Sequence, residues 1–104
     1  MERLEYFKNY RKYLQEVSEI LPGYLKKFEI YVFGSILRGD YSPGLSDIDV
    51  AIVSEEFENR NLRIEIYDLL FEKYFHSPFE FHLLTRKKWE FFLRFIGKDF
   101  ERIF

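Results

Sequence analysis

The sequence feature that most constrains the fold is an apolar strand pattern that begins with two aspartates. Residues 47–53 read Asp-Ile-Asp-Val-Ala-Ile-Val. Because successive side chains of a strand point to opposite faces, Asp47 and Asp49 share one face with Ala51. The other face holds only branched apolar side chains and therefore requires a core on that side. The segment predicts a strand in a sheet, with both acids on the face opposite to that core.

The rest of the chain predicts helices and strands in alternation. Residues 28–33 and 79–84 are rich in β-branched, aromatic and other apolar side chains, a composition that favours strands. Apolar side chains recur at helical spacing over residues 3–21, 60–75 and 86–103. The order is therefore helix, strand, turn or short helix, strand, helix, strand, helix. We expect an α/β (α+β) fold in which helices flank a small mixed sheet of about three strands.

Length and composition limit the classes of protein to which the chain can belong. With 104 residues we expect a single domain over 1–104, because a chain of this size builds one core. The formal net charge is -2, whereas proteins that coat nucleic acid usually have a basic excess, so a nucleic-acid partner is disfavoured. There is no apolar run of membrane-spanning length, no export signal and no cysteine. These absences predict a cytoplasmic protein without a membrane contact.

The two aspartates point to a metal ion beside a phosphate. Like-charged carboxylates held together on a strand are unfavourable unless a cation lies between them. Hard divalent cations such as Mg²⁺ take oxygen ligands and leave coordination sites free for water and phosphate. Gly34-Ser35 follows the strand over 28–33, and such a turn can direct backbone N–H groups and a hydroxyl towards an anion. Arg38 lies one helical turn further on and can contact phosphate oxygens.

Glu80 is the candidate for a third carboxylate, with a solvent-facing strand residue as the alternative. It lies between two phenylalanines on the strand over 79–84. If this strand neighbours the strand over 47–53, all three acids converge. His82 shares the face of Glu80, and for it we expect a packed or surface position rather than a place in the site.

The spacing of these groups resembles the nucleotidyltransferase superfamily of DNA polymerase β, and in particular its minimal members. The signature of that superfamily is Gly-Ser or Gly-Gly, a spacer, Asp-x-Asp on a strand and a later acid on another strand. The spacer before Asp47 has eleven residues, slightly more than in the minimal group, and the third acid of the family is usually Asp rather than Glu. The resemblance implies the polymerase β-like nucleotidyltransferase fold. The residues that match are Gly34-Ser35, Ser46, Asp47, Asp49 and Glu80.

The resemblance also implies a reaction and roles for these residues. Enzymes of this family transfer a nucleoside monophosphate from a triphosphate, here AMP from ATP, to a hydroxyl group, and pyrophosphate leaves. Asp47 and Asp49 would hold two Mg²⁺ or Mn²⁺ ions, and Glu80 would bind the ion nearer the acceptor and help to deprotonate its hydroxyl. The nucleotide would contact the glycine turn and the spacer, through Gly34, Ser35, Arg38 and Ser46.

A partner protein is the last implication of the resemblance. Minimal nucleotidyltransferases are commonly paired with a small helical HEPN-type protein as a toxin–antitoxin couple, in which the enzyme is the antitoxin and adenylylates a tyrosine of its partner. The alternatives are a small aminoglycoside-like acceptor, a homodimer, or a non-catalytic module that binds nucleotide or neutralises a partner by contact. Phe91 and Phe95, four residues apart, predict an exposed ridge that binds another chain together with the second apolar face of residues 60–75.

Overall fold

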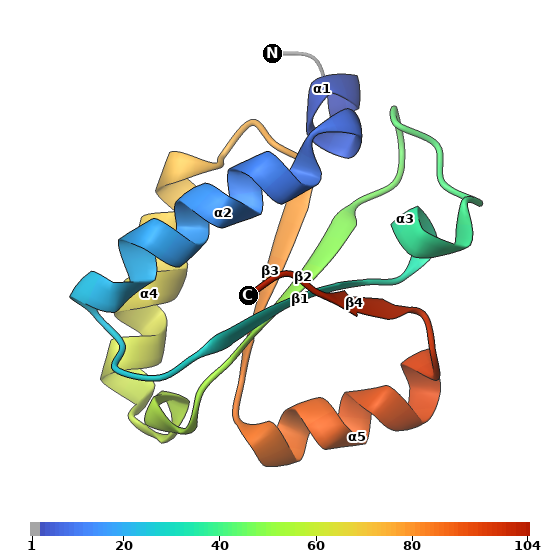
Figure 1. Cartoon of the computed structure of the whole chain (residues 1–104). Helices are drawn as coiled ribbons and strands as arrows, with labels where there is room; N and C mark the ends of the chain where they lie inside the picture. Colours follow the sequence, from blue (N-terminus) through green and yellow to red (C-terminus); the bar gives the residue numbers. More distant parts are fainter. Residues whose placement is uncertain (1–2) are drawn as a thin grey trace.

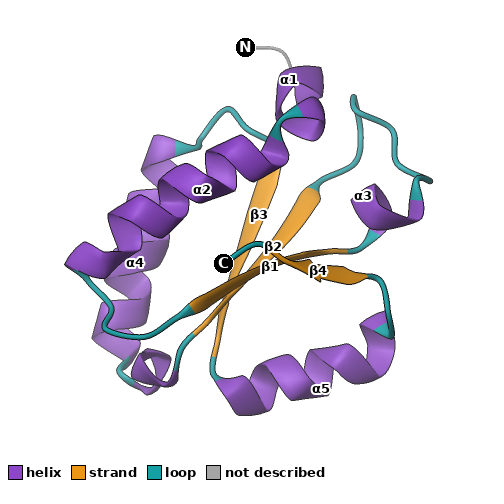
Figure 2. Cartoon of the chain, viewed as in Figure 1, coloured by secondary structure: helices purple, strands orange, loops and turns teal. Residues whose placement is uncertain are grey.

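The structure, a computed structural model, describes residues 3–104 and shows helices packed on both faces of a four-stranded sheet (Figure 1). Figure 2 distinguishes the helices from the strands. The α/β class with a small mixed sheet is confirmed. The helices are α1 (Arg3–Lys8), α2 (Tyr10–Ile20), α3 (Ser35–Arg38), α4 (Arg60–Lys73) and α5 (Arg86–Ile96), with short 3₁₀ helices η1 (Leu21–Gly23) and η2 (Glu55–Glu58). The strands are β1 (Glu29–Phe33), β2 (Ile48–Val53), β3 (Phe79–Leu84) and β4 (Phe100–Arg102).

The strands lie in the order β3-β2-β1-β4. β1 pairs antiparallel with both β2 and β4, whereas β2 and β3 are parallel. A parallel pair needs a long crossover connection, and the segment that contains α4 supplies it. This order places β3 directly beside β2, which is the arrangement that the convergence of the acids requires.

The last helix is shorter than the sequence pattern predicted, and a strand follows it. The prediction of a helix to residue 103 is wrong, because Gly97 adopts a positive φ of 66° and ends α5 at Ile96. The next residues pair with the edge of β1 as β4, and Phe100 packs on the rings of Tyr31 and Trp89. This pairing covers an edge of the sheet that would otherwise be open. The sheet has four strands within the described residues, where the sequence predicted about three.

The N-terminal segment is helical as predicted, but it is divided at Asn9. Asn9 leaves helical geometry with φ -122° and ψ 30°, and its side-chain amide donates to the carboxylate of Glu5 at 3.0 Å. The segment ends in the 3₁₀ turn η1, which contains Pro22 and Gly23. The predicted apolar stripe is buried in spite of the break, at Phe7, Tyr10, Leu14, Val17 and Leu21.

Helices cover both faces of the sheet (Figure 1), and an apolar cluster lies on each face. The larger cluster joins α1, α2 and α4 to the branched apolar side chains of β2 that the alternation assigned to it. The smaller cluster packs Trp89 of α5 on the other face, together with Ala51 of β2. Asp49 belongs to this second face and is partly exposed, whereas Ala51 is fully buried. The cover that α5 provides therefore ends between these two residues and leaves Asp49 accessible.

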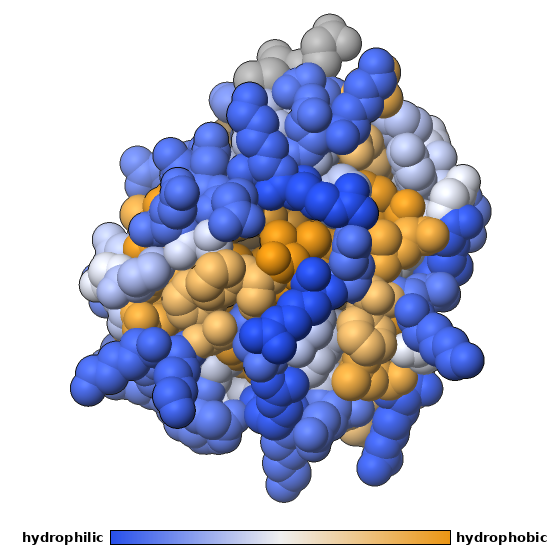
Figure 3. All heavy atoms as spheres, in the orientation of Figure 1, coloured by the Kyte–Doolittle hydropathy of each residue, from blue (hydrophilic) through white to orange (hydrophobic). Residues whose placement is uncertain are grey.

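Several aromatic side chains remain exposed. Phe91 and Phe95 of α5 are 55% and 78% exposed, with ring centroids 5.3 Å apart, so the ridge is present. Helical spacing assigns Tyr67, Phe71 and Tyr74 to the second apolar face of α4; Tyr67 and Phe71 are exposed, whereas Tyr74 is buried. Figure 3 shows hydrophobic patches between hydrophilic residues on one face of the molecule. Binding of another chain to these surfaces stays a prediction. Among the described residues, no helix combines the length and the apolar character that crossing a bilayer requires.

Candidate active site

Two carboxylates and one imidazole gather where β2 and β3 run side by side. The parallel register places Asp49 opposite Glu80, and His82 follows two residues later on the same face of β3. Nε2 of His82 lies 3.3 Å from Oδ1 of Asp49 and 4.0 Å from Oε1 of Glu80. One ligand atom from each of the three residues lies within 4.8 Å of the other two. The structure thus brings Asp49 and Glu80 together, with His82 beside them.

The turn after β1 packs against the carboxylate of Asp49. Phe33, at the end of β1, is the register partner of Asp49, and Gly34 follows with φ 90° and ψ -147°. This conformation is essentially confined to glycine. A Cβ atom at position 34 would lie 2.9 Å from Oδ2 of Asp49. Both the backbone and the space taken by the carboxylate therefore require glycine here.

Ser35 rather than Gly34 provides the free donors of this turn. The N–H of Gly34 donates to the backbone carbonyl of Asp99 at 3.1 Å, which ties the turn to the segment before β4. Within the described part of the chain, neither the N–H nor the hydroxyl of Ser35 forms a hydrogen bond. The donors that the sequence predicted for an anion thus belong to Ser35, while Gly34 allows the close approach of the chain to Asp49.

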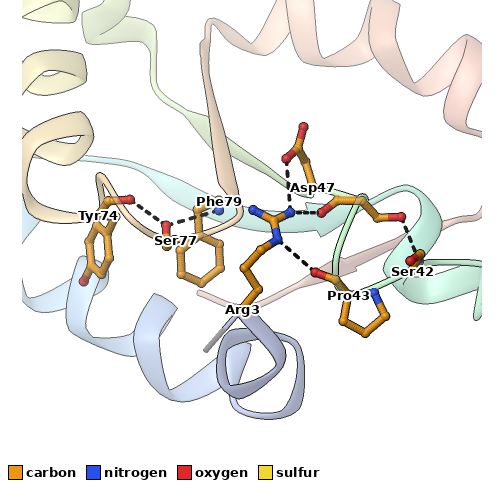
Figure 4. Close-up of polar contacts among 8 residues, drawn as sticks. Arg3, Ser42, Pro43, Asp47, Tyr74, Ser77 and Phe79 are labelled. Atoms are coloured by element: carbon orange, nitrogen blue, oxygen red, sulfur yellow. Dashed lines mark hydrogen bonds and ion pairs between the residues drawn. The ribbon is translucent and has the colours of Figure 1, made fainter. Parts of the chain in front are cut away.

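Asp47 lies outside the group of three. It precedes β2, its side chain is 56% exposed, and its carboxylate lies 3.7 Å from the guanidinium of Arg3 (Figure 4). Arg3 also donates to the carbonyl of Pro43 at 2.8 Å and to the carbonyl of Ser46, so it joins α1 to the loop before β2. The sequence predicted that Asp47 and Asp49 share a strand face. Instead, β2 begins after Asp47, whose carboxylate pairs with a residue of α1.

Ser46 and Arg38 also contact protein groups. The hydroxyl of Ser46 accepts from the N–H of Ser42 at 2.9 Å, and the N–H of Ser46 donates to the carbonyl of Ser42 at 2.7 Å, which closes the loop. Arg38 on α3 pairs with Asp40 at 3.2 Å and lies 3.9 Å from the carboxylate of Asp99. Nucleotide binding by either residue requires these contacts to be shared or exchanged, and it stays a prediction.

His82 is the residue of this group that the sequence patterns placed outside the site. Its ring lies near those of Phe33 and Phe92, with centroids 5.4 and 5.8 Å away, and its side chain is 25% exposed. The available signal was its place two residues after Glu80, which puts both side chains on one strand face. A shared face of β3 indicates a place in the site only once β3 is known to lie beside β2, because Asp49 comes from β2.

A cavity of about 330 Å³ adjoins two of the predicted acids, Asp47 and Glu80. Burial raises the pKa of the Tyr74 phenol in its wall, and the Tyr74 hydroxyl donates to Glu16 at 3.1 Å. Tyr74 is therefore a neutral wall residue rather than a reacting group. The aromatic side chains that line the cavity are Tyr67, Phe71, Tyr74, Phe75, Phe79 and Phe81.

A larger hollow of about 940 Å³ lies elsewhere, next to the start of β1. Burial alone would raise the pKa of Glu29 in its wall, but hydrogen bonds from Tyr31 and Arg86 outweigh this effect and lower that pKa. Arg102 adds a second cation 3.6 Å from Glu29. The charged side chains of Glu29, Arg86 and Arg102 thus pair with one another. None of the predicted site residues lines this hollow.

The group of Asp49, Glu80 and His82 fits a divalent cation. In an octahedral site with bonds of about 2.1 Å, neighbouring ligand atoms lie roughly 3 Å apart and opposite ones roughly 4.2 Å apart. The separations of Nε2 of His82 from the two carboxylates, 3.3 and 4.0 Å, are close to these values, and all three ligand atoms lie within 4.8 Å of one another. The Glu80 side chain is 54% exposed, which leaves one side open to a phosphate. Such a group can neutralise phosphate charge and polarise a hydroxyl next to the free donors of Ser35.

Comparison with known proteins agrees with this geometry. A family model described as a nucleotidyltransferase domain matches residues 10–103. One crystal structure, of a "putative nucleotidyltransferase", is 50% identical, with a TM-score of 0.76; the match covers 86% of this chain and 96% of that chain. A second structure described in the same words, from Sulfolobus solfataricus, is 23% identical, with a TM-score of 0.62 and coverage of 97% and 81%, and it supports the fold alone. A search of curated proteins gave no significant match.

Proposed function

Because the chain belongs to the nucleotidyltransferase domain family, we propose that it transfers AMP from ATP to a hydroxyl group of a partner protein. The observation that supports this proposal most directly is the position of the Asp49 carboxylate. It lies against the glycine turn on one side and beside Glu80 and His82 on the other. The proposed metal site therefore adjoins the proposed phosphate-binding turn, as transfer of a nucleotidyl group requires.

The residues of the site have separate tasks in this reaction. The N–H and hydroxyl of Ser35 bind phosphate oxygens, and Arg38 on the same short helix adds positive charge. Asp49 and Glu80 would hold Mg²⁺ or Mn²⁺. When bound there, such an ion neutralises phosphate charge and lowers the pKa of the attacking hydroxyl. The acceptor oxygen attacks the α-phosphorus, the bond from that phosphorus to the bridging oxygen breaks, and pyrophosphate leaves, while Glu80 accepts the proton of the acceptor.

Asp47 stays in the proposal as a further metal ligand. It is exposed, and it lines the same cavity as Glu80. Its present partner is Arg3, at 3.7 Å. To bind a metal ion, the Asp47 carboxylate must exchange the Arg3 guanidinium for that ion. The exchange costs little free energy because the ion pair is in contact with solvent.

The cavity beside the acids supports an aromatic acceptor. Its wall combines the two acids with the exposed aromatic side chains of α4, including Tyr67 and Phe71. A tyrosine of a partner can stack on such a wall while its hydroxyl approaches Glu80. We therefore infer that the acceptor is a tyrosine of a small helical HEPN-type protein, with this chain as the antitoxin of the pair. The ridge of Phe91 and Phe95 offers a second contact.

A label-transfer experiment tests the proposal. The chain is incubated with ATP labelled at the α-phosphate, Mg²⁺ or Mn²⁺ and the candidate partner, and the labelled partner is measured. We expect transfer by the wild type and a loss of at least about 100-fold in Asp49→Asn, because a charge-stabilising group is removed from the reacting phosphate. Glu19→Gln, an exposed acid on α2, is the control and should transfer at the wild-type rate.

A non-catalytic module is the second candidate, and one set of contacts favours it. Asp47, Ser46 and Arg38 are all engaged by protein groups. This alternative predicts binding of ATP or of the partner with no covalent label. Absence of transfer by the wild type, or equal transfer by Asp49→Asn, would remove the enzymatic proposal.

A further inference from the structure

We propose that His82 is a metal ligand and that the site of Asp49, Glu80 and His82 selects a divalent transition-metal ion, with Mn²⁺ as the probe, over Mg²⁺. The inference rests on the proposed function, since it concerns the ion of the same site. It goes further because it assigns a role to a residue outside the acidic signature and predicts which ion the chain retains.

The strand register places the imidazole within reach of both carboxylates. Asp49 is opposite Glu80, and Ala51 is opposite His82, so the three ligand side chains occupy adjacent positions on one face of β2 and β3. Nε2 of His82 is 3.3 Å from Asp49 and 4.0 Å from Glu80. Ala51 contributes only a methyl group to this face. A single cation among the three therefore meets two carboxylates and one imidazole.

Aromatic packing helps to orient the imidazole, in addition to its contact with Asp49. The ring of His82 packs beside those of Phe33 on β1 and Phe92 on α5, with centroid distances of 5.4 and 5.8 Å. Its side chain is 25% exposed, and that of Asp49 is 28% exposed. The nitrogen is thus already directed at Asp49 in a partly desolvated position. Pre-orientation lowers the conformational cost of binding an ion.

The donor set decides which ion is preferred. Mg²⁺ is a hard ion that keeps oxygen ligands and several waters, so an imidazole nitrogen adds little to its binding. Divalent transition-metal ions bind imidazole, and Mn²⁺, although the weakest binder of the series and an ion that favours oxygen ligands, accepts a nitrogen ligand more readily than Mg²⁺ does. A nitrogen among two carboxylates therefore raises the affinity for Mn²⁺ more than the affinity for Mg²⁺. Removal of the imidazole should reduce the difference between the two ions.

Electron paramagnetic resonance tests this directly on the full chain. Mn²⁺ is titrated into the protein, and the spin-echo modulation of the bound ion is recorded for unlabelled and ¹⁵N-labelled chains. We expect a nitrogen coupling that changes with the isotope, which shows coordination by imidazole in the wild type without any substitution. The coupling should persist in His76→Ala, which removes the other histidine, and should disappear in His82→Ala.

Affinities provide the second measurement. We expect His82→Ala to weaken Mn²⁺ binding by at least about tenfold, while competition by Mg²⁺ changes little. Thermal unfolding of His82→Ala, compared with the wild type, shows whether the variant is folded. If the variant does not fold, the nitrogen coupling in the wild type still tests the proposal. Absence of a nitrogen coupling in the wild type, or equal Mn²⁺ affinity in folded His82→Ala, overturns the proposal.

The two proposals fail independently. A Mn²⁺–nitrogen coupling without label transfer supports the role of His82 and contradicts the transferase function. Label transfer by a wild type that shows no such coupling supports the function and contradicts the role of His82.

Discussion

At the scale of single residues, the site depends on the absence of a side chain at position 34. Gly34 combines a positive φ with a virtual Cβ position 2.9 Å from a carboxylate oxygen of Asp49. Gly39 also has a positive φ, of 78°, but nothing lies within 4 Å of its virtual Cβ. A comparison of substitutions at the two glycines therefore distinguishes the effect of backbone strain from the effect of displacing the Asp49 carboxylate.

We expect Gly34→Ala to lower the free energy of unfolding by about 1–3 kcal/mol and to abolish label transfer, because strain and the clash with Asp49 act together. Gly39→Ala should cost about 1 kcal/mol and leave transfer intact, since only backbone strain is added. Urea denaturation and the label-transfer assay measure both effects. Equal loss of transfer in the two variants would show that the turn at Gly34 has no special relation to the acid.

Two further residues show what single positions can and cannot reveal. Glu80 was a candidate because an acid between phenylalanines is unusual on a strand, and the structure places it opposite Asp49. Asp47 was a candidate because strand alternation puts it on the face of Asp49, yet its carboxylate pairs with Arg3, 44 positions earlier. Local spacing indicates which face a side chain takes, but not which distant residue meets it there.

At the scale of elements, α5 is the helix that closes the face on which the site lies. Trp89 is 1% exposed and packs on Tyr31 and Phe33 of β1, with ring centroids 4.7 and 5.8 Å away. On the same helix, Phe91 is 55% exposed. Two aromatic side chains of one helix thus have opposite environments.

We expect Trp89→Ala to lower the free energy of unfolding by about 3–5 kcal/mol, because it removes the largest side chain of the smaller cluster and leaves a cavity. Phe91→Ala should change it by no more than about 0.5 kcal/mol, since an exposed ring loses little burial. Urea denaturation of both variants compares them. A similar loss for Phe91→Ala would mean that this ring is covered in solution.

The same element shows where sequence patterns fail. The positions of β1, β2, β3 and α4 agree with prediction to within two residues. Asn59 caps α4, and its side chain accepts from the N–H of Leu62. The helix over 86–103 was extended too far because Phe100 and Ile103 continue its apolar spacing. Gly97 was the signal against this extension, and the open edge of β1 determined what the remaining residues became.

At the scale of the whole molecule, two glutamates link the stability of the fold to pH. The N–H groups of Lys27 and Lys26 donate to Glu56 and lower its pKa, which fastens the turn before β1 to η2. The pKa of Glu29 is also lowered, since bonds from Tyr31 and Arg86 outweigh its burial. A carboxylate with a lowered folded pKa contributes stability above its unfolded pKa of about 4.3 and loses that contribution as the pH falls through the folded value.

We therefore expect the melting temperature of the wild type to exceed that of Glu29→Gln/Glu56→Gln near neutral pH, and the difference to shrink as the pH falls below about 4.3. Glu65→Gln, an exposed acid of α4, is the control and should follow the wild type at every pH. Melting curves measured by circular dichroism at a series of pH values give both differences. A difference in melting temperature that stays constant down to acid pH would contradict the lowered pKa values of these two carboxylates.

The sequence by itself determined the local pattern of this protein: which segments are strands or helices, which of their faces are apolar, and where a glycine turn precedes an Asp-x-Asp strand. These properties follow from side-chain spacing within a few residues, since the two periods of backbone structure act locally. Only the tertiary structure decided that β3 lies beside β2, that His82 joins Asp49 and Glu80, that Asp47 faces Arg3 and that β4 completes the sheet. Each of these depends on a contact between distant segments, and the chain selects such contacts by burying apolar area and pairing strand edges over the whole fold rather than by the spacing of neighbouring residues.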